Sequence, residues 1–284
     1  MLPSLAQASS RPGRKQGHVM AQRRVLITGA GSGLGQALAQ RYAKAGDRVA
    51  CVDLDAARAE LTRASLHGSG HLAMVANVAS DEAMEQVHET VAREWGGLDV
   101  LVNNAGIATG GAMVETTMAE WHNVLEINLL GVVRGCRLFL PGMIAAGRGH
   151  VVNTASFAGL AGAPSIMSYG VAKASVVALS EQLRAEMHGK GVTVSVLCPA
   201  FFRTNLLESW QGNPKLRSFA DKMMETSPDT LDSVADAVFA AVERGEFLVI
   251  PTRREPMRWR IKRWLPNFYF KQLVKFARGH GPGN

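Results

Sequence analysis

Tyr169 and Lys173 form the pair of residues in this sequence best suited to acid–base chemistry. They stand in the run Tyr-Gly-Val-Ala-Lys, a spacing that predicts one helical turn between them and both side chains on the same face. A cation beside a phenol favours the phenolate and lowers the tyrosine pKa toward the range useful for proton transfer. Such pairs are also common on protein surfaces, so the surrounding residues decide the interpretation.

Two polar residues upstream extend this pair. Ser156 follows a predicted strand over 150–154, and its hydroxyl is suited to hydrogen-bond a substrate oxygen as charge develops there. A helix cap or a turn is its alternative role. Asn128 stands in an apolar helical run, where structural hydrogen bonding by a buried amide is the main alternative.

A glycine-rich segment from Thr28 to Gly35 follows the first predicted strand and opens the first predicted helix. Without side chains, main-chain N–H groups can approach a pyrophosphate, and the helix dipole favours the anion. A plain strand-to-helix turn is the alternative. The residues predicted to contact a dinucleotide here are Thr28, Gly29, Ser32, Gly33, Leu34 and Gly35.

Asp53 ends the second predicted strand, at the position where an acidic residue recognises the adenosine ribose. Its carboxylate can accept both ribose hydroxyls and would repel a 2′-phosphate. The neighbouring Leu54 and Ser32 offer no basic side chain for such a phosphate, so NAD(H) is favoured over NADP(H). Capping the next helix is the alternative role, although Asp55 can serve there.

Two further segments end predicted strands where the same ligand would lie. Asn77 and Val78 follow the third strand, and Asn103-Asn104-Ala105-Gly106 follows the fourth. Asparagine and glycine often mean only a turn. Their place at the carboxyl edge of the sheet favours cofactor contacts by Asn77, Val78, Asn104, Ala105 and Gly106.

The elements that must position these residues alternate along the chain. Short β-branched runs and longer helical patterns succeed one another from 23 to 250, which predicts a Rossmann-like, doubly wound α/β fold: a parallel sheet of about seven strands with helices on both faces. We expect strands over 24–28, 48–53, 71–76, 98–102, 150–154, 193–197 and 247–250, and helices over 34–45, 56–66, 81–95, 118–140, 169–187 and 231–244.

In these motifs and their order the sequence resembles the short-chain dehydrogenase/reductase family, in its short, single-domain NAD(P)-dependent branch. The resemblance covers roughly residues 23–250. It is carried by Gly29, Gly33, Gly35, Asn103-Asn104-Ala105-Gly106, Asn128, Ser156, Tyr169 and Lys173.

The resemblance implies a role for each of these residues. Tyr169 would be the general acid/base, Ser156 would steady the substrate, and Lys173 would bind the nicotinamide ribose and lower the tyrosine pKa. Asn128 would hold a water in a proton relay. Cofactor contacts by Tyr169, Lys173, Pro199 and Thr204 are also implied. Two departures from the family pattern are Pro199-Ala200, where the family usually has Pro-Gly, and Asn77, where aspartate is usual.

The net charge of +7 comes from the two ends of the 284-residue chain. Residues 1–24 hold five basic side chains and no acid, and residues 253–278 hold nine against Glu255 alone. Residues 25–252 carry 17 basic and 23 acidic side chains, so the body has no general attraction for a polyanion and nucleic-acid binding is not expected.

Three regions follow from this pattern. We expect residues 1–22 to be a disordered leader, with Met20 as an alternative start of translation. Residues 23–252 are expected to form the dehydrogenase domain, with a lid at about 202–228. Residues 253–284 form a basic, aromatic tail that Pro266 divides into two amphipathic pieces. The tail either meets a membrane surface or packs on the protein itself or in an oligomer interface. We expect a cytoplasmic protein, possible membrane association through the tail, and no metal site, since the three cysteines lack ligand spacing.

The sequence therefore predicts an NAD(H)-dependent oxidoreductase that interconverts a secondary alcohol and a ketone. An apolar substrate is the hypothesis, because the lid region supplies Phe201, Phe202, Leu206, Leu207, Trp210, Phe219, Met223 and Met224; these residues could equally pack the lid against the body. The alternatives are an NADPH-dependent ketoacyl-type reductase and a non-catalytic NAD-binding sensor or scaffold recruited by the tail. The resemblance further implies a homodimer or homotetramer.

Overall fold

The structure, a computed structural model, describes residues 22–280. The predicted leader over 1–22 lies outside the described residues except for its last position, and so does Met20.

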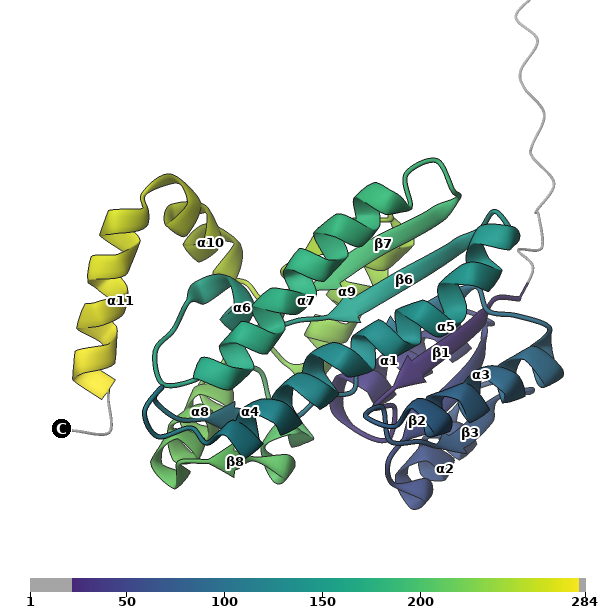
Figure 1. The fold of residues 1–284 in the computed structure, drawn as a ribbon, viewed down its shortest axis with the longest axis horizontal. Coiled ribbons are helices and arrows are strands. Elements are labelled where there is room, and N and C mark those ends of the chain that lie inside the picture. Colours follow the sequence, from purple (N-terminus) through teal and green to yellow (C-terminus); the bar gives the residue numbers. More distant parts are fainter. Residues whose placement is uncertain (1–21, 281–284) are drawn as a thin grey trace, which may run out of the picture.

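Seven parallel strands form one sheet in the order β3-β2-β1-β4-β6-β7-β9 (Figure 1). From β1 the chain builds outward through β2 to β3, and then crosses to the other side of β1 to begin β4. Ligands of open α/β sheets bind where the strand order reverses in this way. The predicted fold class is confirmed, and the strands are β1 Arg24–Thr28, β2 Arg48–Asp53, β3 Leu72–Val75, β4 Val100–Asn103, β6 Gly149–Thr154, β7 Val192–Leu197 and β9 Leu248–Val249.

Helices cover both faces of the sheet because its strands are apolar on both sides. In β1 the side chain of Leu26 packs into one core, and those of Val25 and Ile27 pack into the other. The helices on the first face are α3 Asp81–Trp95, α5 Gly131–Ala145 and α7 Met167–Glu186; those on the second are α1 Gly33–Lys44 and α9 Leu231–Glu243, with α2 Ala56–Ser65 beside β2 and β3.

The helix predicted over 118–140 differs from the prediction in two respects. It consists of α4 (Met118–Leu125), a π-helical turn η1 (Glu126–Leu130) and α5, and it continues past Pro141 to Ala145. Buried Phe139, Leu140 and Met143 hold the helix on the core across the proline. Within residues 22–280, Met118–Ala145 is also the only helix whose length and composition would let it cross a membrane, and its α5 portion packs on the sheet.

The lid predicted at about 202–228 contains regular structure. It forms a 3₁₀ turn η2 (Asn205–Ser209), a short strand β8 (Gln211–Gly212) and α8 (Pro214–Glu225). Strand β8 pairs with β5 (Thr109–Gly110), which follows the β4 end. The lid is thereby attached to the segment that leaves the centre of the sheet.

The C-terminal tail forms two helices, as predicted: α10 (Glu255–Trp264) and α11 (Pro266–His280). Helix α10 packs beside the short α6 (Phe157–Ala161), and α11 runs along the outer edge of the molecule (Figure 1). One edge-to-face ring contact, with centroids 6.2 Å apart, joins Phe276 of α11 to Phe219 of α8.

Candidate active site

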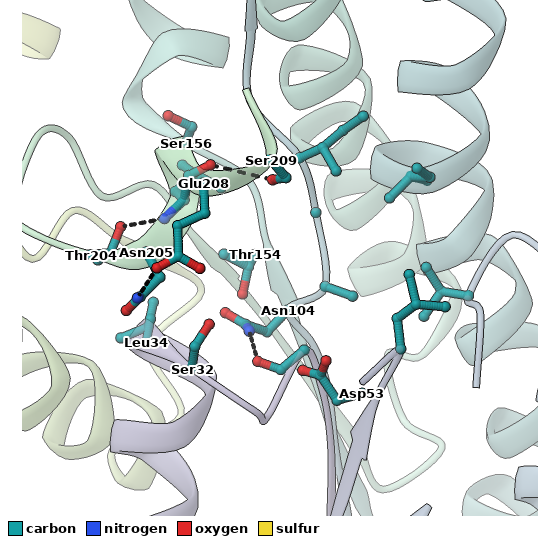
Figure 2. Close-up of a pocket in the computed structure, with 18 of the residues that line it drawn as sticks. Ser32, Leu34, Asp53, Asn104, Thr154, Ser156, Thr204, Asn205, Glu208 and Ser209 are labelled. Atoms are coloured by element: carbon teal, nitrogen blue, oxygen red, sulfur yellow. Dashed lines mark hydrogen bonds between the residues drawn. The ribbon is translucent and has the colours of Figure 1, made fainter. Parts of the chain in front are cut away.

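A cavity of about 770 Å³ opens at the carboxyl ends of the central strands, where the strand order reverses. Figure 2 shows Thr204, Asn205 and Glu208 of the lid opposite Ser32 and Leu34 at the start of α1. Most of the predicted site residues line this one cavity: Gly29, Ser32, Leu34, Asp53, Asn77, Val78, Asn104, Ala105, Gly106, Ser156, Tyr169, Lys173, Pro199 and Thr204.

Four predicted site residues do not line the cavity: Thr28, Gly33, Gly35 and Asn128. Gly33 and Gly35 shape the turn from behind. Gly33 opens α1 at φ +52°, a left-handed conformation that favours glycine. A Cβ on Gly35 would lie 2.1 Å from the carbonyl oxygen of Gly29. Only glycine therefore allows the turn to fold back so tightly on the start of the helix.

Thr28 and Asn104 tie the glycine-rich turn to the end of β4. The Thr28 hydroxyl accepts from the Asn104 and Ala105 N–H groups at 3.0 and 3.1 Å. The Asn104 amide nitrogen in turn donates to the Thr28 carbonyl at 3.0 Å and to the Gly29 carbonyl at 3.3 Å. The Thr28 side chain, predicted to contact the cofactor, therefore bonds the end of β4 and lies outside the cavity lining. The Asn104 side chain also holds the turn, but it lines the cavity.

Asp53 is held at the end of β2 by main-chain donors. Its Oδ2 accepts from the Gly31 N–H at 2.8 Å and its Oδ1 from the Asp55 N–H at 3.1 Å. Asp55, not Asp53, caps α2, through the Arg58 N–H at 3.0 Å. Each carboxylate oxygen keeps a second lone pair for a ligand hydroxyl.

Arg58 is a cavity residue that the sequence analysis missed. The preference for NAD(H) took account of Leu54 and Ser32 beside Asp53, and neither is basic; the first turn of α2 brings Arg58 to the same cavity. Its Nη2 donates to Glu208 Oε2 of the lid at 3.0 Å. A basic residue one turn into the helix after the acid-ended strand is the signal that could have identified it.

Asn77 and Val78 form the wall beyond β3. The Asn77 Oδ1 accepts from the Ala79 N–H at 3.0 Å, which fixes a local turn, and Val78 is buried beneath it. Both residues line the cavity next to Ala76. The sequence allowed Asn77 either to form a turn or to face a ligand. In the structure it forms the turn and also lines the cavity.

Ser156, Tyr169 and Lys173 line the same cavity, Ser156 from just past the end of β6 and the other two from α7. Ser156 caps α6 by accepting from the Ala158 N–H at 3.1 Å, and its hydroxyl lies 3.3 Å from the Pro199 carbonyl, to which it donates. Lys173 is only 4% exposed, and its Nζ donates to the Thr154 carbonyl at 2.9 Å. The ammonium lies 5.9 Å from the centre of the Tyr169 ring.

Burial controls the titration of this pair. It lowers the pKa of Lys173 to about 8, because the charged ammonium loses water. Burial also raises the pKa of Tyr169, and a hydrogen bond with Ser156 only partly opposes this. We expected Lys173 to bring the tyrosine pKa down; the protein alone holds the phenol in its neutral form at pH 7.

Asn128 lies behind the cavity wall, fully buried in the π-helical turn. Its Oδ1 accepts from the Ile107 N–H and its Nδ2 donates to the Ile107 carbonyl, both at 2.9 Å. Structural hydrogen bonding, the alternative role considered for this buried amide, is therefore present, and both bonds go to the protein main chain. A Cβ on Gly106 would lie 2.8 Å from Asn128 Oδ1 and 3.4 Å from Lys173 Nζ, so the amide lies close behind the lysine.

A family comparison decides the class of protein. The model of the short chain dehydrogenase family matches residues 23–215. This chain is a short-chain dehydrogenase. The matched region contains the whole glycine-rich turn, Asp53 and the Ser156, Tyr169 and Lys173 cluster.

Individual members of the family have similar sequences. The chain is 37% identical to D-threitol dehydrogenase of Mycolicibacterium smegmatis over 79% of its own length and 90% of that protein. It is 35% identical to the probable oxidoreductase EphD of Mycobacterium tuberculosis over 85% of its own length. It covers only 43% of EphD, so the chain spans less than half the length of that relative.

Solved structures agree with the fold. A short chain dehydrogenase/reductase from Burkholderia phymatum in complex with NAD superposes with a TM-score of 0.82 at 27% identity, covering 87% of this chain and 95% of that one. A short-chain dehydrogenase from Sphingobium yanoikuyae in complex with NADPH gives a TM-score of 0.73 at 28% identity, covering 88% and 95%. Solved structures similar to this chain therefore include one in complex with NAD and one in complex with NADPH.

The lid of this short-chain dehydrogenase divides its apolar residues between two tasks. Phe202, Leu206 and Met224 line the cavity. Leu207 and Met224 pack with Ala220 in a small core of the lid, against which Trp210 rests. Both alternatives raised from the sequence are thus present: part of the set faces the cavity and part packs the lid.

The cysteines are not arranged as metal ligands. Cys51, Cys136 and Cys198 are buried with free thiols, and burial raises the pKa of each to about 12. Within residues 22–280, no group of three His, Cys, Asp or Glu side chains lies close enough to hold a metal ion.

Proposed function

We propose that this short-chain dehydrogenase interconverts a secondary alcohol and a ketone by hydride transfer with NAD(H), using Tyr169 as general acid/base. One observation carries the proposal: Ser156, Tyr169 and Lys173 face the same cavity as the glycine-rich turn and Asp53. The cavity thus contains both a cradle for a dinucleotide and groups for proton transfer. We retain the prediction of a homodimer or homotetramer as part of this proposal.

The residues present fit a nicotinamide dinucleotide. The glycines of the turn from Gly29 to Gly35 let its main chain fold tightly at the start of α1, where a pyrophosphate would bind, and Asp53 keeps acceptor capacity for ribose hydroxyls. Asn77 and Val78 would border the adenine, and Pro199 and Thr204 the nicotinamide. When bound, the nicotinamide ring supplies the hydride acceptor or donor.

The side chains of the chain itself supply the proton chemistry. In alcohol oxidation, the Tyr169 phenolate removes the hydroxyl proton as the carbon loses a hydride, and in ketone reduction the phenol returns it. The Ser156 hydroxyl donates to the reacting oxygen as its charge changes. We infer that the Lys173 ammonium, fixed on the Thr154 carbonyl, stabilises the phenolate formed during the reaction and so opposes the burial that raises the Tyr169 pKa at rest.

NAD(H) is the cofactor we favour, because the carboxylate of Asp53 would repel a 2′-phosphate. Arg58 supports a second candidate, an NADPH-dependent reductase of the ketoacyl type, since its guanidinium lies at the same end of the cavity. In the structure this guanidinium is paired with Glu208 at 3.0 Å, which leaves less positive charge for a phosphate. The repelling carboxylate of Asp53 and the pairing of Arg58 with Glu208 together support NAD(H) over NADP(H).

The substrate we infer is apolar. Phe202, Leu206 and Met224 come from the lid, and Ile107 and Ile127 come from the segments beside Asn128. Flexible and branched apolar side chains around a few fixed polar groups suit a hydrophobic alcohol. Turnover confined to sugars or small polyols would contradict this part of the proposal.

A panel of alcohols with NAD⁺ and NADP⁺, and of ketones with NADH and NADPH, tests the proposal directly. Replacing Tyr169 by Phe removes one hydroxyl, and we expect turnover to fall at least about a hundredfold while NAD⁺ binding, measured by calorimetry, is retained. Retained turnover would refute the mechanism. Cofactor binding without turnover of any alcohol or ketone by the unmodified protein would favour the sensor or scaffold alternative.

A further inference from the structure

The two C-terminal helices form a basic arm, with Glu255 as its single acid, on a body that carries excess acid. We call α10 and α11 together the arm. After Glu255 the sequence contains seven Lys or Arg and no Asp or Glu, whereas residues 25–252 contain 17 basic and 23 acidic side chains. The positive charge of the arm therefore meets no acidic side chain of the arm itself beyond Glu255.

One face of α10 attaches the arm to the body. The Lys262 Nζ donates to the carbonyl of Leu160 in α6, and Glu255 is buried and bonded to Arg258 at 3.1 Å. Beside its exposed arginines, α10 also exposes two large apolar side chains: Met257 is 58% and Trp264 is 79% exposed. A tryptophan indole this exposed is unusual on a soluble surface.

In α11, apolar and basic side chains are neighbours on the surface. Phe270 and Val274 lie one turn apart, each followed by a lysine, and together with Lys271 and Lys275 they border a shallow surface hollow of about 340 Å³. Phe270 is 63% exposed. Exposed Leu265 and Phe268 continue the apolar surface to the junction with α10.

The composition of this surface distinguishes between a lipid and a protein partner. Protein interfaces are depleted in lysine at their centre, because each ammonium buried there needs a carboxylate. At a bilayer surface, lysine stems lie along the apolar region while their ammonium groups reach the phosphates, and tryptophan and phenylalanine sit at the headgroup level. Lysines directly beside the exposed aromatics match the second arrangement.

We propose that the arm binds the surface of an anionic lipid bilayer, with Trp264, Phe268 and Phe270 at the headgroup level and Lys271 and Lys275 on lipid phosphates. The arm lies in the interface and does not cross it, since neither helix reaches the length of a membrane span. Through the contact of Phe276 with Phe219, the bound arm borders α8, which also provides Met224 to the active-site cavity. The inference does not depend on the reaction that the cavity performs.

Vesicle flotation of the full chain tests the proposal. Vesicles of phosphatidylcholine with 30% phosphatidylglycerol, prepared at low salt, should carry the protein to the top of the gradient, and pure phosphatidylcholine vesicles should carry much less. Replacing Lys271 and Lys275 by Gln should weaken binding by about fivefold for each charge, so roughly 25-fold for the pair. Added salt should weaken the binding of the unmodified chain as well.

A matched variant controls for net charge. Lys44 at the end of α1 and Lys190 before β7 are exposed lysines on the body, and replacing both by Gln removes the same charge far from the arm. This variant should float as the unmodified chain does. A third variant, Trp264→Ala with Phe270→Ala, should bind weakly even at low salt, because the apolar contacts are lost.

The proposal is overturned if the unmodified chain does not float with anionic vesicles. It is also overturned if the arm and body lysine variants lose vesicle binding equally. A third contrary result is that the arm variants dissociate a dimer without any change in flotation. The last would assign the arm to a second copy of the chain. Thermal melting of each variant and its turnover of a water-soluble alcohol report on folding. Absence of turnover in the unmodified chain would count against the proposed function alone.

Discussion

The side chain of Asn128 and the main chain of Ile107 form a closed pair of hydrogen bonds, each 2.9 Å long. The pair joins the π-helical turn between α4 and α5 to the segment that leaves the end of β4. Asn128 Oδ1 and Lys173 Nζ both lie beside Gly106, so the pair fixes the main chain next to the lysine. The residue that the family resemblance places in a proton relay is thus also a structural link.

Replacing Asn128 by Ala should reduce both stability and activity. Two part-buried main-chain groups of Ile107 lose their partner, which we expect to cost about 2 kcal/mol in the free energy of unfolding. Urea denaturation measures this loss, and steady-state kinetics measure the fall in kcat. Asn123→Ala is the control, because that amide bonds Gln211 at the surface, and it should change stability by less than about 1 kcal/mol. Equal stabilities of the two variants would contradict the assigned role.

Adding one methyl group at Gly35 should abolish cofactor binding. The new Cβ would lie 2.1 Å from the Gly29 carbonyl oxygen, so the turn must open and its N–H groups move away from the pyrophosphate position. We expect NAD⁺ affinity to fall at least about a hundredfold, measured by calorimetry. Gly142→Ala is the matched control, since nothing lies within 4 Å of a Cβ there and alanine favours the interior of α5. A Gly35→Ala protein that binds NAD⁺ normally would contradict the assigned role of the turn.

Asp53 and Arg58 should together set the cofactor preference. In Asp53→Ser the repelling carboxylate is lost, and we expect NAD⁺ affinity to fall about tenfold while NADP⁺ affinity rises. If Arg58 then binds the 2′-phosphate, adding Arg58→Ala should remove the gain for NADP⁺ and leave NAD⁺ affinity unchanged. The ratio of the two dissociation constants is the measurement. A ratio that Asp53→Ser does not alter would show that the preference lies elsewhere.

Stability should fall in mildly acidic solution because of His150. The Ser195 hydroxyl donates to the Glu246 carbonyl at 2.6 Å, so its oxygen accepts from His150 Nε2–H at 2.8 Å. Burial, with a smaller contribution from the charge of Arg23, lowers the pKa of His150 to about 4, below its usual 6.5. The unfolded chain therefore takes up the proton first as the pH falls. The contribution of the neutral His150 to the free energy of unfolding is complete above about pH 6.5 and is lost as the pH falls toward 4.

We expect the free energy of unfolding to drop by about 2 kcal/mol between pH 7 and pH 4.5 on this account. Urea denaturation across that range measures the drop, and His150→Gln should lessen it while keeping a donor for Ser195. An identical pH dependence in the variant would rule out His150 as the source.

Features that depend on neighbouring residues could be predicted from the sequence. The seven strands followed from short apolar runs, and the glycine-rich turn followed from residues next to one another. The helical spacing of Tyr169 and Lys173 likewise placed them on one wall of the cavity. The position of Asp53 at the end of β2 followed from the length of one βα unit.

Contacts between distant segments required the tertiary structure. Arg58 meets Glu208 across 150 positions, Asn128 meets Ile107 across 21, and the lid residues divide between the cavity and their own core. Burial reversed the expected direction for the pKa of Tyr169, because desolvation depends on everything packed around the phenol. The sequence by itself determined the order of the βα units, the glycine-rich turn and the basic character of the tail, since these are set by local spacing and composition. The tertiary structure decided which side chains share a wall and which face of the arm is exposed, because those depend on how the packed elements meet in space.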